Sequence, residues 1–324
     1  MSEKIKIGLV GYGNLGKGVE LALPLFPDVE VVAVFTRRDP ATLVTTIPAY
    51  AIDTILDFKD KIDVLLLCGG SATDLPVQGP AYAEHFNTID SYDNHNEIPK
   101  YFAAVDAAAK TNNHVSVISV GWDPGLFSLN RVLAESVLPQ GENYTFWGKG
   151  LSQGHSDALR RIEGVKKAVQ YTVPVEDALK AVRSGSNPTL KTREKHTREC
   201  FVVVHEGADK AKIEKEIKSM PNYFEPYNTT VTFIDDATFD AEHTTMPHGG
   251  FVIRTGNSGQ NKQKIEFNLE LGSNPEFTSS VLVAYARAAA RLVKDGKSGA
   301  FTVLDIPVAY LSEKSGEELR KELL

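Results

Sequence analysis

A glycine-rich string near the start of the chain constrains its fold more than any other segment. Gly11, Gly13 and Gly16 form a G-x-G-x-x-G pattern. The aliphatic run before it, Ile5–Val10, predicts a buried strand, and residues 17–25 predict a helix. In this context the glycines allow a tight turn and a close approach to a pyrophosphate, which the N-terminus of the helix attracts. The strand and the helix therefore favour a dinucleotide site over the alternative, a glycine turn without a ligand.

The end of the next predicted strand, residues 29–35, distinguishes between the two nicotinamide cofactors. An NAD-binding chain places Asp or Glu about 20 residues further on, where it accepts a hydrogen bond from the ribose 2′-hydroxyl. Here the strand is followed by Thr36, Arg37 and Arg38, and the first acid is Asp39. A guanidinium pairs with a 2′-phosphate, whereas a carboxylate repels it. We therefore predict NADP(H), bound by Thr36, Arg37 and Arg38; a solvated strand end is the alternative interpretation.

Strands and helices alternate through the first third of the chain. Buried strands are predicted at 62–68, 87–90 and 115–120, and a helix is predicted at 99–110. This alternation predicts an α/β fold, a doubly wound Rossmann-type parallel sheet with helices on both faces. Near the end of the chain, a helix of about 274–294 and a strand at 300–305 are expected to return to this sheet.

The middle of the chain has a different pattern, which predicts a second domain of the α+β type with one, more antiparallel sheet. The predicted strands lie at 144–146, 197–204, 231–234, 251–254 and 264–271, the predicted helices at 175–182 and 211–220, and a mobile polar loop at 183–195. We therefore expect a dinucleotide-binding domain of residues 1–123 plus about 275–324, and a second domain of residues 124–274.

The composition excludes several classes of function. The 35 basic and 42 acidic residues give a net charge of −7, which argues against nucleic acid and membrane surfaces as partners. The two cysteines lie far apart, so neither a disulfide framework nor a zinc site is expected. His243 and His248 are spaced poorly for a metal, and none is predicted. No apolar run reaches the roughly 18–20 residues that span a bilayer, and we expect a reducing, cytoplasmic setting.

Two acids and two tryptophans fall at places where a substrate could meet the cofactor. Asp93 and Asp123 follow predicted strands, and the carboxyl ends of parallel strands line the ligand crevice. Trp122 directly precedes Asp123, and Trp147 lies directly after the predicted strand 144–146. Acids beside an aromatic ring suit an ammonium substrate. A turn cap for each acid and a core position for each tryptophan are the alternatives.

Several strings together resemble the meso-diaminopimelate D-dehydrogenase family. They are the glycine string, SATD at 71–74, YDNH at 92–95, GWDPG at 121–125, TFWG at 145–148, VQYT at 169–172, MPHGG at 246–250, SGAFTV at 298–303 and, most specifically, GLSQGHSDALRR at 150–161. The resemblance implies NADP(H)-dependent interconversion of meso-2,6-diaminopimelate with L-2-amino-6-oxopimelate and ammonia. It also implies a role in lysine and cell-wall precursor synthesis, and a homodimer assembled through the second, substrate-binding domain.

The same resemblance implies which residues form the site. At the cofactor these are Gly11, Tyr12, Gly13, Asn14, Leu15, Gly16, Thr36, Arg37, Arg38, Ser71, Ala72, Thr73, Ser91, Tyr92, Asp93, Pro124, Gly125, Leu126, Phe127 and Ser128. At the reacting end of the substrate they are Asp93, Asp123, Trp147, Gln153 and Gly154, and at its far, L-configured end Thr172, Arg198, His248 and Asn274.

The residues leave two questions open. Asp93 or Asp123 would take the proton of the amine, directly or through water, or would only stabilise the charge that develops there. The nearest alternative functions are an NADP-dependent D-amino acid dehydrogenase of broader specificity and a non-catalytic NADP-sensing module.

Overall fold

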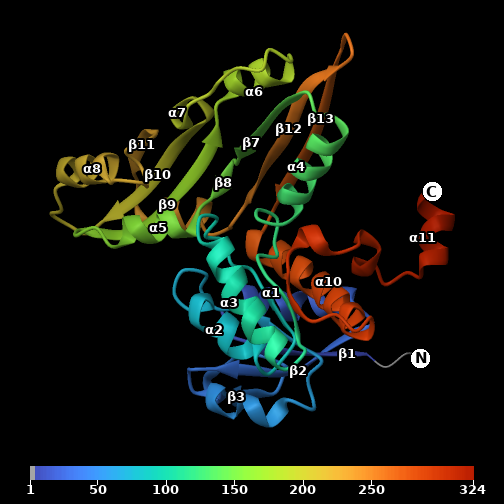
Figure 1. Cartoon of the computed structure of the whole chain (residues 1–324). Coiled ribbons are helices and arrows are strands. Elements are labelled where there is room, and N and C mark those ends of the chain that lie inside the picture. Colours follow the sequence, from blue (N-terminus) through green and yellow to red (C-terminus); the bar gives the residue numbers. More distant parts are fainter. Residues whose placement is uncertain (1–3) are drawn as a thin grey trace. The chain divides into compact units, whose positions relative to one another are not determined.

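A computed structural model describes residues 4–324 and divides them into two compact units. One unit contains the described residues up to Leu129 together with Pro275–Leu324, and the other contains Asn130–Asn274 (Figure 1). The last fifty residues thus belong with the N-terminal part of the chain, and helix α4 (Leu126–Val137) begins in one unit and ends in the other.

The first unit is built on a seven-stranded sheet in the order β14-β6-β5-β4-β1-β2-β3, with all neighbouring strands parallel. The predicted doubly wound fold class is therefore confirmed. The strands are β1 (Ile5–Val10), β2 (Val29–Thr36), β3 (Ala49–Ala51), β4 (Val64–Leu67), β5 (Thr88–Asp90), β6 (Val115–Val117) and β14 (Gly299–Phe301). The returning strand is shorter than predicted, because a short 3-10 turn, Val303–Asp305, follows it.

The helices of this unit are α1 (Asn14–Ala22), α2 (Leu75–Ala83), α3 (Ile98–Thr111), α10 (Asn274–Lys294) and α11 (Gly316–Leu323), with 3-10 turns at Leu23–Leu25, Pro40–Thr42, Ile52–Phe58 and Val308–Leu311. Helix α1 begins three residues before the predicted start at 17, directly after the second glycine of the string. Helix α2, with Pro80 inside it, was not predicted.

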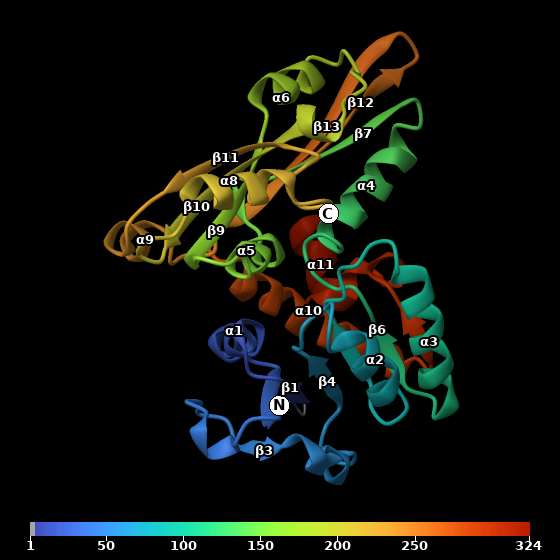
Figure 2. The same cartoon turned by 90° about the vertical axis from the view of Figure 1, so that its left-hand side faces the viewer.

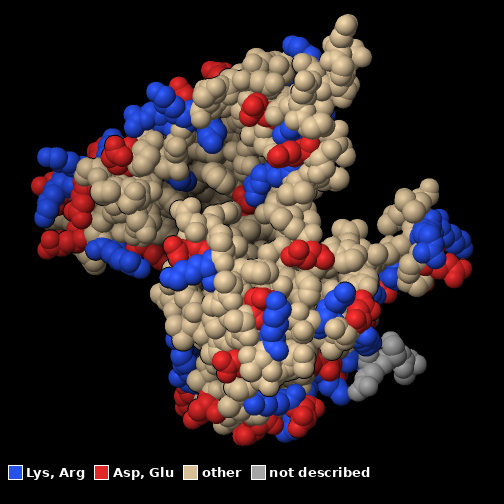
Figure 3. Space-filling model, viewed as in Figure 1, with Lys and Arg blue, Asp and Glu red and all other residues tan. Residues whose placement is uncertain are grey.

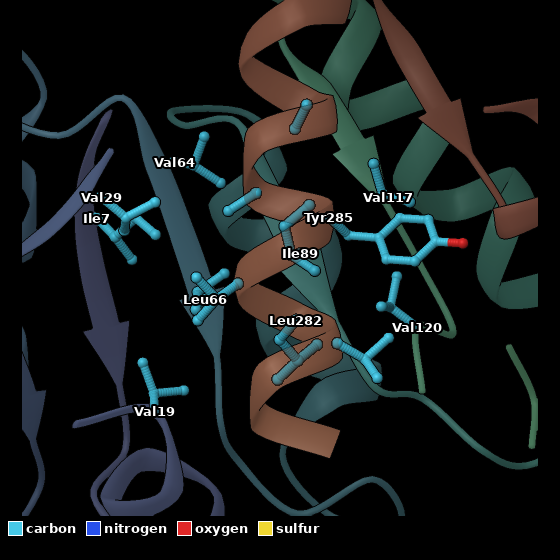
Figure 4. Packing of buried hydrophobic residues seen from close by; sticks show 14 of the residues in the cluster. Ile7, Val19, Val29, Val64, Leu66, Ile89, Val117, Val120, Leu282 and Tyr285 are labelled. Atoms are coloured by element: carbon cyan, nitrogen blue, oxygen red, sulfur yellow. The ribbon is translucent and has the colours of Figure 1, made fainter. Parts of the chain in front are cut away.

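Both faces of the sheet are covered, because successive residues of each strand point to opposite sides. Leu66 of β4 is fully buried in a cluster with Leu282 and Tyr285 of α10 (Figure 4). Its neighbour Leu65 is fully buried in a second cluster with Val105 of α3. The long C-terminal helix is thus the cover of one face, which explains why the end of the chain returns to the first sheet.

A charged pair attaches α10 to the edge of the loop before β2. The guanidinium of Arg287 donates two hydrogen bonds of 2.6 Å to the two carboxylate oxygens of Asp28, and its side chain is only 5% exposed. These bonds hold the pKa of Asp28 below its usual value, against the opposing effect of burial. The ring of Phe26 lies 5.6 Å from the same guanidinium.

The second unit contains two sheets rather than the single one predicted. The four-stranded sheet has the order β11-β10-β9-β8 and the three-stranded sheet the order β13-β12-β7. The strands are β7 (Gly141–Trp147), β8 (Gly150–Leu151), β9 (Val165–Pro174), β10 (His196–Val204), β11 (Asn228–Phe233), β12 (His248–Ser258) and β13 (Asn261–Leu271). The helices are α5 (Gln153–Arg160), α6 (Glu176–Arg183), α7 (Thr192–Lys195), α8 (Lys210–Ser219) and α9 (Asp236–Glu242).

Three differences from the predictions have local causes. Strands β10 and β11 pair in parallel because α8 crosses between them; its Ile213 and Ile217 pack in the same cluster as Cys200 of β10 (Figure 2). Strand β9 was missed because lysine, glutamine and threonine obscure its alternation, although five successive residues of it, 168–172, are buried. The predicted loop at 183–195 ends in helix α7.

Charged side chains of both signs are interspersed over the face of the molecule seen in Figure 3.

Within residues 4–324, no helix is both long and apolar enough to cross a membrane. The same residues contain no group of three His, Cys, Asp or Glu side chains arranged to hold a metal ion.

We predict that Asp28→Asn lowers the free energy of unfolding at pH 7 by about 1.5–3 kcal/mol, as expected for hydrogen bonds to a charged group. The folded pKa of Asp28 is depressed, so its contribution is present above the unfolded pKa and is lost as the pH falls through the folded pKa. Urea unfolding should therefore show the wild-type advantage shrinking below about pH 4. A difference that stays constant from pH 7 to pH 3 would contradict a role for the charge.

Candidate active site

The glycine string forms a cradle that only small residues permit. Gly11 has φ +93° and donates its N–H to the carbonyl of Phe35 at 2.8 Å. A Cβ atom on Gly16 would lie 2.5 Å from the carbonyl oxygen of Gly11, whereas Gly13 faces open space. Gly13 caps α1 without a side-chain hydrogen bond, and the first turn of α1 contains no acid. The loop and helix end therefore fit an anionic pyrophosphate.

The ring of Tyr12 lies beside the glycine string, with its Cδ2 atom 3.5 Å from where a Cβ of Gly16 would be. Its hydroxyl bonds to Glu20 of α1, which also accepts from Thr45 Oγ1 at 2.9 Å and from Thr46 N at 2.8 Å. Burial opposes the charge of Glu20, but these hydrogen bonds prevail and lower its pKa to about 2. Tyr12 thus fixes the loop before β3 against α1 while its ring lies against Gly16 of the string. The sequence pattern gave no sign of this role for Glu20.

The predicted phosphate-binding residues gather at the end of β2. Arg38 donates from Nη2 to the carbonyl of Tyr12 at 2.7 Å and from its backbone N–H to Thr36 Oγ1 at 3.1 Å. Arg37 is exposed and pairs with Asp74, with Nη1 2.9 Å from Oδ1. The first acid after the strand, Asp39, accepts from Ala41 N at 3.0 Å and caps its own turn. Two arginines and no free carboxylate beside the glycine string fit a 2′-phosphate.

The loops after β4 and β5 are joined through a carboxylate. Ser71 donates to Asp93 Oδ1 at 2.5 Å and accepts from the backbone N–H of Asp93 at 2.9 Å. The other predicted members of these loops are Ala72, Thr73, Ser91 and Tyr92, and Tyr92 is buried. Asp93 itself is exposed. The pair fixes one candidate carboxylate beside the loop that is expected to border the cofactor.

The second candidate carboxylate lies in a tight turn after β6. Gly125 has φ +134°, and a Cβ there would lie 1.7 Å from the carbonyl oxygen of Gly121. Trp122 is 8% exposed and packs edge-on against Phe127, with ring centroids 5.2 Å apart. Its indole is therefore a core residue, while Asp123 stands in the turn that begins α4. The remaining predicted members of this turn are Pro124, Leu126 and Ser128, whose Oγ accepts from Gly125 N.

A buried cation is the main feature of the second unit. Arg198 of β10 is 6% exposed and lies opposite Thr172 of β9, whose Oγ1 accepts from its Nη1. The guanidinium carbon lies 3.9 Å from the ring centroid of Tyr227, and Nε is buried without a hydrogen-bond partner. Burial lowers the pKa of Arg198. Among the described residues no carboxylate pairs with this cation, so the geometry fits an anionic ligand.

Two glycines bring His248 to the same place. Gly150 pairs with Thr172 in the sheet, and a Cβ on Gly150 would lie 2.4 Å from Nδ1 of His248. Gly148 has φ +109°, and a Cβ there would lie 2.0 Å from the carbonyl oxygen of Thr172. Glycine at 150 leaves room for the imidazole of His248 beside the strand that carries Thr172, and glycine at 148 lets the chain pass close to the carbonyl of Thr172.

The other residues predicted in this unit lie around Met246, two residues before His248. Gln153 donates from Nε2 to the sulfur of Met246 at 3.2 Å, and Asn274 donates its backbone N–H to the carbonyl of Met246 at 2.9 Å. Gly154, in the first turn of α5, has nothing within 4 Å of a Cβ position. Gln153 and Asn274 thus both contact the segment 246–248.

His196 is a member of this group that the sequence interpretation missed. Its Nε2 accepts from the backbone N–H of Trp147 at 2.8 Å, and the two rings stack at 5.3 Å with an interplanar angle of 24°. His196 is 2% exposed; burial, and then the charges of Arg198 and Lys195, lower its pKa to about 3. Its position two residues before Arg198, on the same face of the strand, was the available signal.

Comparisons with known proteins agree along the whole chain. Residues 121–273 match the model of the diaminopimelic acid dehydrogenase C-terminal domain. A meso-diaminopimelate D-dehydrogenase of Lysinibacillus sphaericus is 66% identical over 323 residues, 99% of each chain. The solved structure of a six-fold substituted meso-diaminopimelate dehydrogenase of Clostridium tetani with diaminopimelate is 56% identical, with a TM-score of 0.94 over 99% of this chain and 100% of that one. An engineered D-amino acid dehydrogenase bound to NADP+ is 46% identical, with a TM-score of 0.89 over 99% and 100%.

The depressed pKa of His196 predicts a specific pH dependence of stability. Between the folded pKa of about 3 and an unfolded value of about 6.5, the unfolded chain binds the proton, so the free energy of unfolding falls as the pH falls. One such group adds a slope of up to about 1.4 kcal/mol per pH unit. We expect His196→Gln, which keeps an acceptor for Trp147, to flatten the slope between pH 6 and pH 4.5 by about that amount.

Urea unfolding at a series of pH values measures this slope. His205→Gln is the matched control, because the ring of His205 is exposed to solvent in the folded chain. Equal slopes for the wild type and His196→Gln would contradict a neutral, buried acceptor at this position.

Proposed function

Because this chain belongs to the meso-diaminopimelate D-dehydrogenase family, with a relative 66% identical over its whole length, we propose that it converts meso-2,6-diaminopimelate, water and NADP+ to L-2-amino-6-oxopimelate, ammonium, NADPH and a proton, and catalyses the reverse reaction. The observation that carries this proposal is the buried guanidinium of Arg198. Within residues 4–324 it has no carboxylate partner, and it lies beside Thr172; a substrate with a second carboxylate at its far end would supply that partner.

The far end of the substrate is held by the second unit. The carboxylate of the L-centre pairs with Arg198, whose planar guanidinium suits bidentate binding. Thr172 and His248 contact the same end of the substrate. Asn274 lies on the same segment as His248 and contributes from there. A neutral His196 leaves the positive charge of this place on Arg198 and sets the backbone of Trp147. Fixing the far end selects which of the two amino-acid ends reacts.

A relative supports this assignment. The Clostridium tetani protein carries substitutions of a glutamine, a threonine, an arginine, a proline, a histidine and an asparagine, in that order along its chain. The same residue types follow in the same order here, at Gln153, Thr172, Arg198, Pro247, His248 and Asn274. Altering this set in a diaminopimelate-binding relative is expected if the set determines which substrate the enzyme accepts.

The reacting end is held by carboxylates of the first unit. Asp93 and Asp123 stabilise the ammonium of the D-centre, and one of the two accepts its proton so that the amine can become an imine. Trp147, Gln153 and Gly154 enclose this end. NADP+, when bound, supplies the chemistry by accepting the hydride from the D-centre carbon, and water then hydrolyses the imine. The rate gain of the protein comes mainly from orientation, worth up to about 7–11 kcal/mol when well-placed groups react within one complex.

The cofactor is held by the glycine string and the end of β2. The N-terminus of α1 binds the pyrophosphate through Gly13, Asn14 and Leu15, and the 2′-phosphate is held by Arg37 and Arg38 with Thr36. The loops that contain Ser71–Thr73, Ser91–Asp93 and Pro124–Ser128 border the rest of the molecule. Residues 1–123 with about 275–324 accordingly form the nucleotide domain, and residues 124–274 the substrate and dimerisation domain.

The cellular setting follows from the family. A diaminopimelate dehydrogenase serves the synthesis of lysine and of cell-wall precursors, and we place the enzyme in the cytoplasm as a homodimer. Size-exclusion chromatography with light scattering measures the oligomeric state, and a monomer at micromolar concentration would contradict the dimer.

We predict that NADPH forms from NADP+ with meso-diaminopimelate and not with the LL isomer, which has no D-centre. The DD isomer offers a D-centre but the wrong configuration at its far end, so we expect at least about 100-fold lower kcat/KM, the loss that misplacement of reacting groups causes. Absorbance at 340 nm measures the reaction. Equal rates with simple D-amino acids would favour the broader dehydrogenase, and no turnover despite NADPH binding would favour the sensing module.

We predict that replacing Arg37 and Arg38 together by alanine weakens NADPH binding by about 100-fold and NADH binding by less than about threefold, because only NADPH carries the 2′-phosphate that a guanidinium pairs with. Fluorescence titration of the two cofactors measures both affinities. Lys61→Ala, which removes an exposed cation of the same unit outside the site, is the control. An equal loss for the two cofactors would show that the arginines do not bind the phosphate.

A further inference from the structure

A buried carboxylate that the proposed reaction does not use is bonded to both loops that carry the candidate acids. Asp90 is the last residue of β5 and is 1% exposed. Its Oδ1 accepts from the backbone N–H groups of Tyr92 and Ser119, both at 3.0 Å, and its Oδ2 accepts from the hydroxyl of Tyr101 at 2.7 Å. All these contacts lie within the first unit.

The two backbone donors belong to different loops. Tyr92 precedes Asp93 in the loop after β5, and Ser119 lies four residues before Asp123 in the loop after β6. The backbone adds one further link, because Val120 donates its N–H to the carbonyl of Asp90 at 2.8 Å. One residue therefore fixes the starting points of both loops that carry the candidate acids.

Asp90 is buried, and its carboxylate oxygens serve as hydrogen-bond acceptors. Burial raises its pKa, and the three hydrogen bonds oppose that rise. No Lys, Arg or His of the described residues pairs with it, so donors alone offset the desolvation of the buried carboxylate. Removing such an acceptor leaves its buried N–H partners unsatisfied, which disfavours the present conformation of both loops.

The backbone at Ser119 needs this support. Ser119 has φ +57°, a left-handed conformation that is unfavourable for a residue with a Cβ. Its own hydroxyl oxygen is buried without a partner, so the side chain does not stabilise the conformation. The bond from its N–H to Asp90 does, and the reversal of the chain at Ser119 directs it toward Gly121 and Asp123.

We propose that Asp90 is a positioning residue that sets Asp93 and Asp123 together, by accepting one backbone N–H from each of the two loops that carry them. The proposal rests on the proposed function in one respect only, the assignment of Asp93 and Asp123 to the reacting end. Asp93 is held a second time by Ser71, so the network extends from the loop after β4 to the loop after β6.

The test compares four variants of the full chain. Asp90→Ala removes both acceptors, and Asp90→Asn keeps one oxygen for the two backbone donors. Tyr101→Phe removes only the donor to Oδ2. Thr88→Val is the matched control, because it breaks a buried side-chain bond of 2.8 Å between Thr88 and Ser116, on the same two strands but two residues from Asp90.

The readouts separate positioning from stability. We expect Asp90→Ala to lower kcat for meso-diaminopimelate by about 10–100-fold, the effect of misplacing catalytic groups by about 1 Å. Asp90→Asn should recover kcat to within about fivefold of the wild type, since the oxygen that both loops use is kept. Tyr101→Phe should keep more than half of the wild-type kcat, and Thr88→Val should lose thermal stability without losing kcat.

Hydrogen exchange makes the test independent of activity. In Asp90→Ala, peptides covering 91–95 and 118–123 should exchange faster while peptides of α10 stay unchanged; in Thr88→Val neither loop should change. If Asp90→Ala does not fold, Asp90→Asn and Tyr101→Phe still test the proposal. A tenfold loss of kcat in Tyr101→Phe would overturn it. So would a tenfold loss of kcat in Asp90→Asn while the two loops exchange at the wild-type rate. A wild type inactive on meso-diaminopimelate but with loop exchange as expected would instead overturn the proposed function.

Discussion

Everything in the first unit depends on a parallel sheet with both faces buried. Because its strands alternate between two apolar clusters, the chain must supply helices to each side, and it returns its longest helix, α10, to cover one of them. Because the strands are parallel and both faces are covered, the carboxyl ends of β1, β2, β4, β5 and β6 are exposed together at one edge of the sheet. The glycine cradle, the arginines and the two acid-bearing loops all arise there, so the proposed cofactor site and the two candidate carboxylates are carried by the same sheet.

The second unit solves a different problem, the burial of one positive charge. Arg198 is enclosed by Thr172 and Tyr227, and none of the described residues places a carboxylate beside it; His196, two residues earlier on the strand, is kept neutral. A buried cation of this kind is poorly solvated, so pairing with an anion stabilises it. The ligand that suits it best is an anion that also binds at a second point. A chain with an amino acid at each end is such a ligand, and this is why binding energy at the far end can select the end that reacts.

The sequence permits prediction wherever a segment has one clear period. Six of the seven strands of the first unit, and α10, could be predicted because aliphatic runs and a regular apolar stripe leave few alternatives; the three-residue edge strand β3 was missed. Strand β9 and helix α5 could not, because lysines, glutamine and glycines obscure their buried positions. The glycine string and Arg37 and Arg38 could be interpreted from chemistry alone, whereas Thr172, Arg198 and His248 depended on the family resemblance. Asp90 gave no signal, because its role consists of backbone contacts between distant loops.

If Arg198 recognises the far carboxylate of the substrate, its loss must affect substrates that carry this carboxylate more than those that lack it. D-Lysine has the D-centre and the distal amine of meso-diaminopimelate but lacks that carboxylate, so kcat/KM for the two substrates should be measured in the wild type and in Arg198→Met. We predict that the wild-type preference for meso-diaminopimelate falls by at least about 30-fold in the variant, the loss of about 2 kcal/mol or more expected when one partner of a buried charge pair is removed. A preference that survives the substitution unchanged would contradict the account.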